Sequence, residues 1–365
     1  MRTFPKIAII YLSYNSESYL DDVVSSLKHL TYPKDKVEFV VVDNPHPEHG
    51  DSMKILREKF LPISGGEIPH VTLLGQKTNL GFAGGNNVGI KWAIDAGFDY
   101  IFLHNHDGFI AAGSLEPLVE AMEADDNIGA AQPMILLHPE TDLVNTSGNA
   151  FQYLGFGYCD NFRKRFDARD FKEAFETSYA SGAAVLLRVD LLKKFGGWDE
   201  DYFMYHEDIE YSFRLRAAGY KIIVVRDSIF YHKYQFSRLK EKMYYIERNR
   251  FGLLISYLKI STLLLLLPMA IILELGLLLY ALKCGWIKQK LVAYRYWLQA
   301  SNWRLWLAKR RRLAQIRKIS DRNFICSFTG KISFGDKDFN SSVLRYVGNP
   351  IMSAYWFVIK NLIFW

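Results

Sequence analysis

The stretch VEFVVVDN at residues 37–44 is a short run of Val and Phe that ends in an acid and an amide. Similar apolar runs lie on both sides of it, and helix-like stretches separate them. The runs are residues 7–14, 71–74 and 100–104, and the helix-like stretches are residues 19–30, 53–60 and 86–96. Alternating buried strands and helices are typical of a parallel sheet covered on both faces. The sequence therefore predicts a doubly wound α/β domain.

Polar residues follow three of these predicted strands. They are Ser13, Tyr14 and Asn15 after the first strand, Asp43 and Asn44 after the second, and Asn105, His106 and Asp107 after the fourth. In doubly wound sheets, ligands bind beyond the carboxyl ends of the strands. We therefore expect these three groups of residues to share one rim of the sheet.

Asp107 is a candidate metal ligand on this rim, because hard divalent cations prefer oxygen ligands. His232 lies just beyond another predicted strand, residues 221–225, and a histidine there can complete such a site. Both residues also have an ordinary structural interpretation: a loop Asp often caps a turn, and a lone His is more often a hydrogen-bonded structural residue. Spacing alone does not show that the two residues meet.

The segment YHEDIE at residues 205–210 places three carboxylates, Glu207, Asp208 and Glu210, at the start of a predicted helix. The helix dipole tolerates negative charge at this end, so helix capping explains the cluster. A carboxylate in this position is also a candidate general base, which would take a proton from an attacking hydroxyl group.

The segment NLGFAGGNN at residues 79–87 is a glycine-rich turn that enters a helix. Its backbone N–H groups and amides have the chemistry to contact a phosphate or a sugar. It lacks the dinucleotide-binding fingerprint and the Lys-Ser/Thr pair of phosphate-binding loops. A tight turn with close helix packing explains the glycines equally well. Asp43 also has two interpretations: it could accept a hydrogen bond from a ribose or a base, or it could cap a turn.

The composition is that of a folded protein, since 50% of the 365 residues are hydrophobic and 23% are charged. The three cysteines are far apart and odd in number, which favours a reducing compartment over a disulfide framework. The apolar N-terminal stretch is too short and too interrupted by polar residues for a signal peptide, so we expect a first strand there.

Residues 253–282 are mostly apolar, interrupted by Lys259, Pro268 and Glu274. Thirty residues can cross a membrane once but not twice. Basic residues lie on both sides of the stretch, and the positive-inside tendency places both sides in the cytoplasm. These observations favour a re-entrant or in-plane helix pair, broken near Pro268.

A basic run at residues 304–318 follows this apolar stretch and predicts contact with an anionic surface. Basic helices also bind nucleic acid. Apolar residues interleaved with these charges fit a membrane interface better. They are Trp303, Leu305, Trp306, Leu307, Leu313 and Ile316. We therefore expect a membrane surface along residues 253–318, and no nucleic acid.

Taken in order, the motifs of this chain resemble those of the family 2 glycosyltransferases of the GT-A fold, especially the rhamnosyltransferase and galactofuranosyltransferase-like branch. The resemblance covers about residues 5–250 and is most specific between Ser181 and His232. The motifs are SYN at residues 13–15, VVVDN at 40–44, NLGFAGGNN at 79–87, FLHNHD at 102–107, SGAAVLLR at 181–188, FGGWDEDYFMYHEDIEYSFRLRAAGY at 195–220 and YH at 231–232.

The resemblance implies a role for each motif residue. Nucleotide-sugar binding falls to Ser13, Asn15, Asp43, Asn79, Gly81, Asn86 and Asn105, and Mg²⁺ or Mn²⁺ binding to Asp107 and His232. Asp208, paired with Glu207, is the implied catalytic base of a single displacement that inverts the anomeric centre, and Trp198 and Asp199 are implied to line the acceptor site. The sequence departs from the family pattern at two places: residues 105–107 hold one carboxylate instead of two, and Asp43 is followed by Asn-Pro-His-Pro-Glu.

These implications predict a GT-A catalytic domain at residues 1–250, with a nucleotide-sugar half at 1–110 and an acceptor half at 111–250. A helical, basic, membrane-associated region follows at 251–365. The expected reaction is metal-dependent transfer of a sugar, such as rhamnose or another deoxy or furanose sugar, from a nucleotide-diphosphate donor.

We expect a dTDP- or UDP-sugar as donor and a lipid-linked or cell-surface glycan as acceptor. The expected location is the cytoplasmic face of the cell membrane, and an oligomer is possible. A processive synthase is disfavoured, because the Gln-x-x-Arg-Trp motif is missing. The alternative that remains is a non-catalytic scaffold protein that binds nucleotide sugars.

Overall fold

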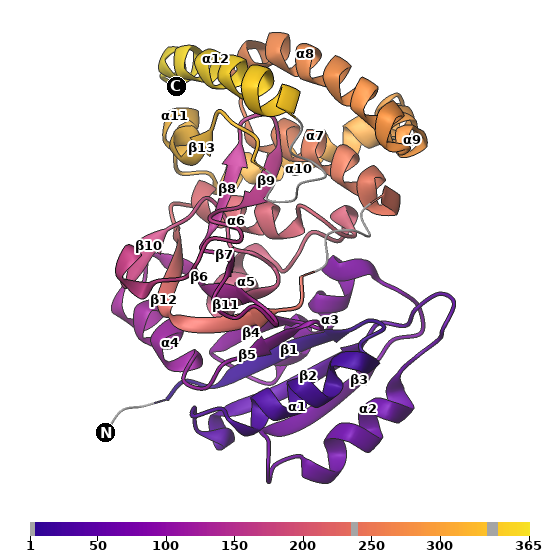
Figure 1. Cartoon of the computed structure of the whole chain (residues 1–365), viewed down its shortest axis with the longest axis vertical. Coiled ribbons are helices and arrows are strands. Elements are labelled where there is room, and N and C mark those ends of the chain that lie inside the picture. Colours follow the sequence, from indigo (N-terminus) through magenta and orange to yellow (C-terminus); the bar gives the residue numbers. More distant parts are fainter. Residues whose placement is uncertain (1–3, 235–239, 334–341) are drawn as a thin grey trace. The chain divides into compact units, whose positions relative to one another are not determined.

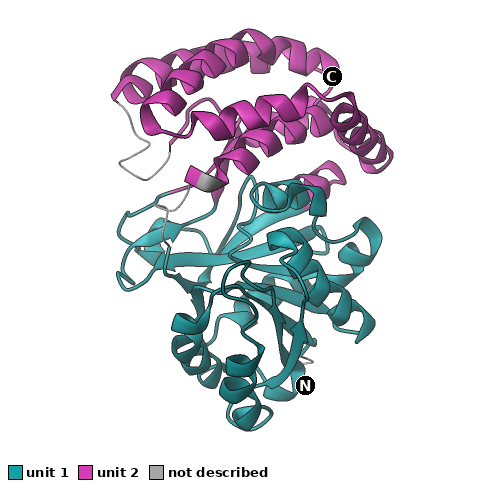
Figure 2. Cartoon of the chain, turned by 90° about the vertical axis from the view of Figure 1, so that its right-hand side faces the viewer, with its two compact units in different colours: residues 1–148, 161–212, 221–234 teal, residues 149–160, 213–220, 235–365 magenta. Residues whose placement is uncertain are grey.

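The structure is a computed structural model and describes residues 4–234, 240–333 and 342–365. The chain divides into two compact units (Figure 2). Unit 1 comprises residues 1–148, 161–212 and 221–234, and unit 2 comprises residues 149–160, 213–220 and 235–365. Each unit gathers several stretches of chain, and the functional division into residues 1–250 and 251–365 stays a prediction.

Unit 1 contains a ten-stranded sheet (Figure 1). Its strands are β1 (Ile7–Ser13), β2 (Val37–Asp43), β3 (His70–Gly75), β4 (Tyr100–Asn105), β5 (Gly108–Ile110), β6 (Ile128–Leu137), β7 (Val144–Thr146), β10 (Ala174–Glu176), β11 (Ala184–Arg188) and β12 (Lys221–His232). The order is β10-β12-β6-β11-β4-β1-β2-β3, and β5 and β7 pair with β12 and β6. The four strands from β3 to β4 are mutually parallel, whereas β11 is antiparallel to both of its neighbours, β4 and β6.

Helices cover both faces of this sheet. They are α1 (Leu20–Lys28), α2 (Met53–Phe60), α3 (Gly81–Asp95), α4 (Leu115–Ala124) and α5 (Val189–Phe195). Tyr11 and Phe39 belong to one buried core with α1, α2 and α4. Ile10 and Leu12 alternate with Tyr11 along β1, and they pack against α3 on the other face. The predicted doubly wound α/β architecture is therefore confirmed.

Helix α3 approaches the sheet closely because glycines lie where it meets β1. A Cβ atom on Gly85 would lie 2.5 Å from the Leu12 side chain, and one on Gly89 would lie 2.5 Å from the Ile10 side chain. Real side chains do not come so close, so any larger residue would push the helix away. The glycine-rich segment thus seats the start of α3 against the strand ends.

Unit 2 is mainly helical, and α6 (Glu207–Ala217) begins in unit 1 and ends in unit 2. The other helices are α7 (Met243–Tyr257), α8 (Ile260–Cys284), α9 (Ile287–Trp297), α10 (Ala300–Ile316), α11 (Asp321–Phe324) and α12 (Asn349–Leu362), and a small sheet holds β8 (Asn149–Gln152), β9 (Phe156–Cys159) and β13 (Phe328–Thr329). The ring of Phe151 lies 4.7 Å from that of Phe213 and 4.8 Å from that of Phe328. These aromatic contacts join distant stretches of chain into one core.

The predicted break near Pro268 is wrong, because α8 continues through this proline as one helix of 25 residues. Proline removes one backbone hydrogen bond, but leucines on both sides favour the helix and keep it intact. In the described part of the chain, α8 is the one helix long and apolar enough to cross a membrane, by length and composition alone. A continuous helix contradicts the predicted broken pair, and membrane contact of α8 stays a prediction.

Four charged side chains meet in the interior of unit 2. Lys290 on α9 is fully buried, and its Nζ lies 2.6 Å from Glu247 Oε2 and 2.9 Å from Glu274 Oε2. Arg250 on α7 forms ion pairs with the same two carboxylates. Tyr294 donates a hydrogen bond of 2.7 Å to Glu274. Two acids and two bases thus balance each other and join α7, α8 and α9.

Removing one member of this network should destabilise unit 2. We expect Lys290→Met to lower the free energy of unfolding by about 3–5 kcal/mol, because methionine keeps the side-chain length but leaves Arg250, within the described chain, as the one cation that faces Glu247 and Glu274. Lys288→Met on the exposed side of α9 is the matched control, with an expected change within about 0.5 kcal/mol. Chemical denaturation followed by tryptophan fluorescence measures both, since six of the eight tryptophans lie in unit 2. Equal effects of the two substitutions would refute the role of the network.

Candidate functional site

The carboxyl ends of β1, β2 and β4 lie on one rim of the sheet, as the sequence predicts. Ser13 is opposite Asp43, and Leu12 is opposite Asn105. Ser13 is fully buried, and its hydroxyl oxygen lies 2.8 Å from that of Ser16. Parallel register therefore brings the three predicted polar groups to one edge.

Asp43 shapes the loop that follows β2. Its carboxylate accepts a hydrogen bond of 2.9 Å from the backbone N–H of Ser52. Burial raises the pKa of Asp43 to about 6. Asn15, across the rim, has a φ of +52°, a conformation that asparagine tolerates better than most residues. Their roles in nucleotide binding stay predictions.

Asn44 has a larger structural role than the sequence indicated. Its side-chain oxygen accepts a hydrogen bond of 2.8 Å from the backbone N–H of Leu80, and its amide nitrogen donates to Asn79 and to the carbonyl of Gly81. Asn79 in turn accepts the Gly81 N–H at 2.8 Å. The amide directly after Asp43 was the available signal: it ties the end of β2 to the glycine-rich turn.

The glycine-rich turn packs against a strained segment before α6. The carbonyl oxygen of Phe203 accepts hydrogen bonds from the N–H groups of Phe82 and Ala83, at 2.8 and 3.1 Å. A Cβ atom on Gly81 would lie 2.5 Å from the Phe203 ring, and Phe203 has a φ of +62°. The first donors of α3 are thus used within the chain, which supports the packing interpretation of the turn. The Asn86 amide likewise donates to the Phe82 carbonyl.

Asp107 and His232 meet, although 124 residues separate them in the sequence. Asp107 lies in the turn between β4 and β5, and His232 ends β12, which pairs with β5. His232 Nε2 lies 2.9 Å from Asp107 Oδ1. The Asn105 amide nitrogen lies 2.7 Å from the same carboxylate oxygen and 3.3 Å from the same ring nitrogen. The pairing of β5 with β12 therefore brings Asp107 and His232 into contact, which their spacing in the sequence could not show.

The hydrogen bonds of His232 leave Nε2 directed at an acceptor. Its other nitrogen, Nδ1, lies 2.9 Å from the side-chain oxygen of Asn145, so the Asn145 side chain fixes the orientation of the ring. Nε2 faces the Asp107 carboxylate oxygen, so a proton or a cation must lie between these two atoms. Asn145, on β7, had no signal in the sequence.

Burial by itself raises the pKa of Asp107, but the electrostatic interaction and the hydrogen bond with His232 outweigh it and lower the pKa to about 2. The donor set also fits a divalent ion, because adjacent ligands of an octahedral Mg²⁺ lie about 3 Å apart. Mn²⁺ fits the same mixture of carboxylate and imidazole. Asn105 is an amide that donates a hydrogen bond to Asp107. Asp107 is therefore the one carboxylate among residues 105–107.

Asp208 and Glu207 open helix α6 next to a glycine. Asp208 accepts hydrogen bonds from the backbone N–H groups of Gly182, at 3.1 Å, and Ile209, at 2.7 Å. Burial raises the pKa of Asp208 to about 6. Burial and the neighbouring Asp208 charge raise the pKa of Glu207 well above its ordinary value. Glu207 therefore keeps its proton more readily than Asp208.

A short path of backbone connects Asp208 to the Asp107–His232 pair. The N–H of Asn105 donates to the carbonyl of Ala183 at 2.9 Å, and the preceding residue, Gly182, donates to Asp208. The end of β4 and the residues just before β11 thus place both groups at one edge of the sheet.

The two predicted acceptor residues have structural contacts of their own. Trp198 is buried, and its backbone N–H and carbonyl both bond to the Asn87 side chain at 2.8 Å. Asp199 accepts a hydrogen bond of 3.1 Å from the Asp201 N–H. Acceptor binding by either residue stays a prediction.

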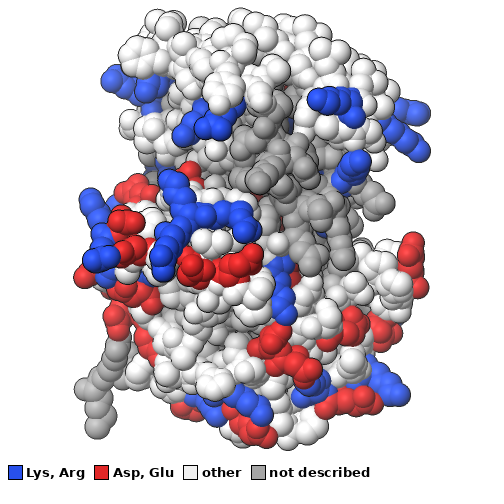
Figure 3. Space-filling model, in the orientation of Figure 1, with Lys and Arg blue, Asp and Glu red and all other residues white. Residues whose placement is uncertain are grey.

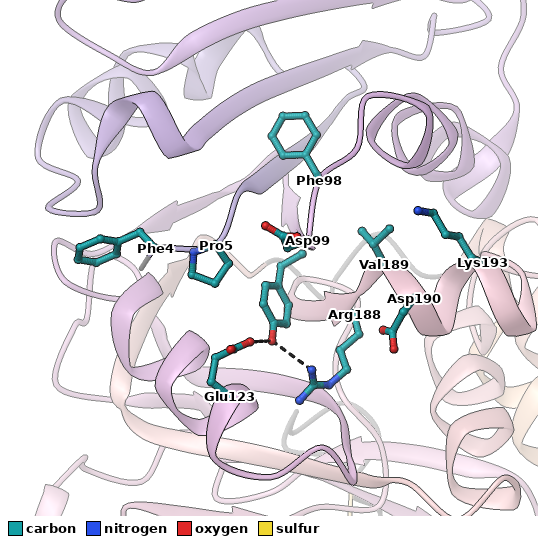
Figure 4. A pocket seen from close by; sticks show the side chains of 10 residues that line it. Phe4, Pro5, Phe98, Asp99, Glu123, Arg188, Val189, Asp190 and Lys193 are labelled. Atoms are coloured by element: carbon teal, nitrogen blue, oxygen red, sulfur yellow. Dashed lines mark hydrogen bonds between the residues drawn. The ribbon is translucent and has the colours of Figure 1, made fainter. Parts of the chain in front are cut away.

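Two other features of unit 1 lie outside the predicted site residues. His46, Glu48 and His49 follow Asn44 and hold their ligand-type atoms within 4.8 Å of one another. Figure 4 shows a second feature, a hollow lined by Asp99, Glu123 and Arg188, among others, with a volume of about 530 Å³. It lies at the amino end of β4, whereas Asp107 follows the carboxyl end of that strand. There Arg188 donates a hydrogen bond of 3.2 Å to the Tyr100 hydroxyl and others to backbone carbonyls. The hollow is thus separate from the candidate site.

Curated relatives share part of the chain. It is 24% identical over 237 residues to the "Probable glycosyltransferase YdaM" of Bacillus subtilis, a match that covers 61% of this chain and 49% of that protein. It is 25% identical over 245 residues to the N-acetylglucosaminyl-diphospho-decaprenol L-rhamnosyltransferase of Mycobacterium tuberculosis, with 62% of this chain and 76% of that protein covered. The chain thus spans about half the length of the Bacillus relative.

Structural and family comparisons agree on the fold. A crystal structure of GalNAc-T7 with UDP, GalNAc and Mn²⁺ matches with a TM-score of 0.51 at 15% identity, over 69% of this chain and 50% of that one. Identity this low shows the fold alone, which is the expected GT-A fold. The sequence profile described as "Glycosyl transferase family 2" matches residues 8–196, more than half of the chain. The chain therefore belongs to glycosyl transferase family 2.

Proposed function

We propose that this chain is an inverting glycosyltransferase that moves a sugar from a nucleotide-diphosphate donor to a glycan acceptor. The observation that carries the proposal is the Asp107–His232 pair at one edge of the sheet, joined through the Asn105–Ala183 hydrogen bond to the segment that holds Asp208. A diphosphate leaving group needs a cation, and an attacking hydroxyl needs a base. Asp107 and His232 are the candidate ligands of the cation, and the Asp208 carboxylate is the candidate base.

Asp107 and His232 would hold Mg²⁺ or Mn²⁺, which offsets the negative charge on the departing nucleoside diphosphate. Asn145 fixes the orientation of the His232 ring, and Asn105 holds the Asp107 carboxylate in place. Such neighbours fix the protonation state and direction of metal ligands.

Asp208 would accept the proton of the acceptor hydroxyl as that oxygen attacks the anomeric carbon. The backbone hydrogen bonds from Gly182 and Ile209 hold its carboxylate in one orientation. Burial and the neighbouring Asp208 charge raise the pKa of Glu207, so Asp208 is the member of the pair that we assign as the base. Neighbouring carboxyl groups with different pKa values can in this way take different roles.

The remaining predicted residues surround this centre. Ser13, Asn15 and Asp43 would contact the nucleotide, while Asn79, Gly81, Asn86 and Asn105 would lie near the diphosphate and sugar, and Trp198 and Asp199 would line the acceptor site. The strand-end positions of Ser13 and Asp43 support the nucleotide contact, and the positions of Gly81 and Asn86 on α3 support the contact with diphosphate and sugar. A dTDP- or UDP-sugar would be the donor.

The acceptor would be lipid-linked or a growing cell-surface glycan, at the cytoplasmic face of a membrane. The name of the mycobacterial relative refers to a sugar linked to decaprenol through a diphosphate. The basic residues of 304–318 would hold the chain at an anionic surface. Proximity to the membrane would raise the effective concentration of an anchored acceptor.

Asp208→Asn should lower sugar transfer by about 10² to 10⁴-fold, because a carboxamide cannot take the hydroxyl proton. The assay is release of nucleoside diphosphate from dTDP-, UDP- and GDP-sugars with Mn²⁺ and a lipid-linked acceptor. The variant should keep the rise in melting temperature that the donor causes, since a ligand that binds the folded state stabilises it. Asp126→Asn, whose side chain is 98% exposed, is the matched control with unchanged activity. An Asp208→Asn variant as active as wild type would contradict the role of this residue, and no donor binding by wild type would contradict the proposed function itself.

The transfer rate should depend on pH through Asp208. The base acts in its ionised form, so with a pKa of about 6 the value of kcat/KM should rise tenfold per pH unit below about pH 6 and level off above it. Steady-state kinetics between pH 5 and 8.5 at saturating Mn²⁺ measure this profile. A rate that is flat or falls as pH rises from 5 to 7 would be incompatible with a carboxylate base of this pKa.

A further inference from the structure

Helix α8 exposes a continuous apolar stripe. Its members are spaced three or four residues apart on one face of the helix, apart from the adjacent pair Ile271 and Ile272, and each is 50–68% exposed. They are Ile260, Leu264, Leu267, Ile271, Ile272, Leu275, Leu279 and Leu282. The most apolar 18-residue window of α8 has a mean hydropathy of 2.5 and is only 17% buried. A core helix of a soluble protein would be mostly buried, so this face lacks a partner within the described chain.

Helix α12 adds a second apolar face beside the first. The Tyr355 hydroxyl donates a hydrogen bond of 2.6 Å to the Leu265 carbonyl, and the Trp365 indole N–H donates one of 2.9 Å to the Thr262 hydroxyl. These bonds hold α12 and Trp365 along the first half of α8 (Figure 1). Exposed apolar side chains on and just after α12 are Ile351, Phe357, Val358, Leu362 and Phe364, each 52–75% exposed. Residues 349–364 belong to the predicted membrane-associated region at 251–365, but they lie outside residues 253–318, along which the sequence predicts the membrane surface.

The charges around these faces have one sign. Residues 253–365 contain 17 Lys and Arg but four Asp and Glu, a balance of +13 in a chain whose total is +6. Within the described part of this stretch, the two acids are Glu274 and Asp321, whose side chains are 19% and 0% exposed and form ion pairs. Every exposed side-chain charge there is consequently positive. Figure 3 shows Lys and Arg groups among wide uncharged areas on the visible face of these helices.

Ion pairs hold the inner face of α8 to α7 and α9. Glu274 lies near the middle of the helix and forms ion pairs with Arg250 on α7 and Lys290 on α9. If α8 crossed a bilayer alone, Glu274 would leave these partners and enter hydrocarbon, where an unpaired carboxylate is strongly disfavoured. If it kept the pairs, α7 and α9 would have to enter with it. The helix can instead keep the network and place only its outer stripe in lipid.

We propose that the outer faces of α8 and α12 form one docking surface for a membrane leaflet that contains anionic lipid, with α8 lying in the plane of the membrane. Apolar side chains would enter the boundary between headgroups and acyl chains, and the surrounding Lys and Arg would meet lipid phosphates. At 25 residues, α8 would extend over about 37 Å of the surface. This inference rests on the membrane association in the proposed function but not on catalysis, so sugar transfer and membrane docking can fail separately.

Vesicle flotation of the full chain tests the docking surface. Wild type should float with vesicles of phosphatidylcholine and phosphatidylglycerol at 70:30, and at least about tenfold less with phosphatidylcholine alone. Leu264→Ser with Leu275→Ser, and separately Phe357→Ser with Phe364→Ser, should each reduce partitioning, by roughly tenfold for each side chain removed. These residues are exposed, so the folded state should persist, which circular dichroism checks. Ile55→Ser with Leu61→Ser on unit 1 is the matched control, since these side chains are also exposed.

Equal flotation of the α8 variant, the α12 variant and the control would overturn the proposed surface. Failure of wild type to float, together with a dimer in solution that the same α8 substitutions dissociate, would assign the face to a second copy of the chain instead. Retained nucleotide-sugar turnover with a soluble acceptor in either case would leave the proposed catalytic function standing.

Labelling of the two ends of α8 tests its orientation. Lys259→Cys and Lys283→Cys are each made in a chain whose three native cysteines are serine, and the protein is added to preformed 70:30 vesicles. An impermeant maleimide outside the vesicles should label both positions to the same extent, because both ends of an in-plane helix stay on one side. Protection of one end with labelling of the other would show a spanning helix and overturn the in-plane arrangement.

Discussion

The contact between His232 and Asp107 is the constraint on which the candidate site depends. With the ring held by Asn145, the Nε2 atom and a carboxylate oxygen lie 2.9 Å apart, a distance that needs a proton or a cation between the two atoms. In a complex with a diphosphate, a divalent ion would take the place of the proton. Asp107 directly precedes β5 and His232 ends β12, so the pair forms only when these two strands pair. Formation of this part of the sheet therefore also assembles the site.

Part of this arrangement could be predicted from sequence. Buried runs that end in polar residues located the rim, because parallel strands bring their carboxyl ends together. The order of the motifs identified the family, and the resemblance assigned Asp107 and His232 to one metal site. Physical reasoning from the residues could not join them, because a contact across 124 residues depends on strand order and register.

Other features had no usable signal before the structure. Asn145 and Phe203 act through hydrogen bonds whose partners are distant in the sequence, so neither residue type nor spacing pointed to them. The proline in α8 was misleading, because its local cost does not outweigh the helix preference of the leucines around it. Glu274 interrupted an apolar run in the sequence, and its buried ion pairs with Arg250 and Lys290 explain why it is there.

Direct detection of Mn²⁺ binding tests the central claim most sharply. Free Mn²⁺ gives a strong electron paramagnetic resonance signal that is lost on binding, so a titration with UDP or dTDP present counts bound ions without an acceptor or turnover. The account predicts one nucleotide-dependent Mn²⁺ per chain in wild type, loss of that ion in Asp107→Ala, and its retention when His46 and His49 are both alanine. An ion that binds equally well to Asp107→Ala, or that is lost with the two histidines, would contradict the assignment of the metal to Asp107 and His232.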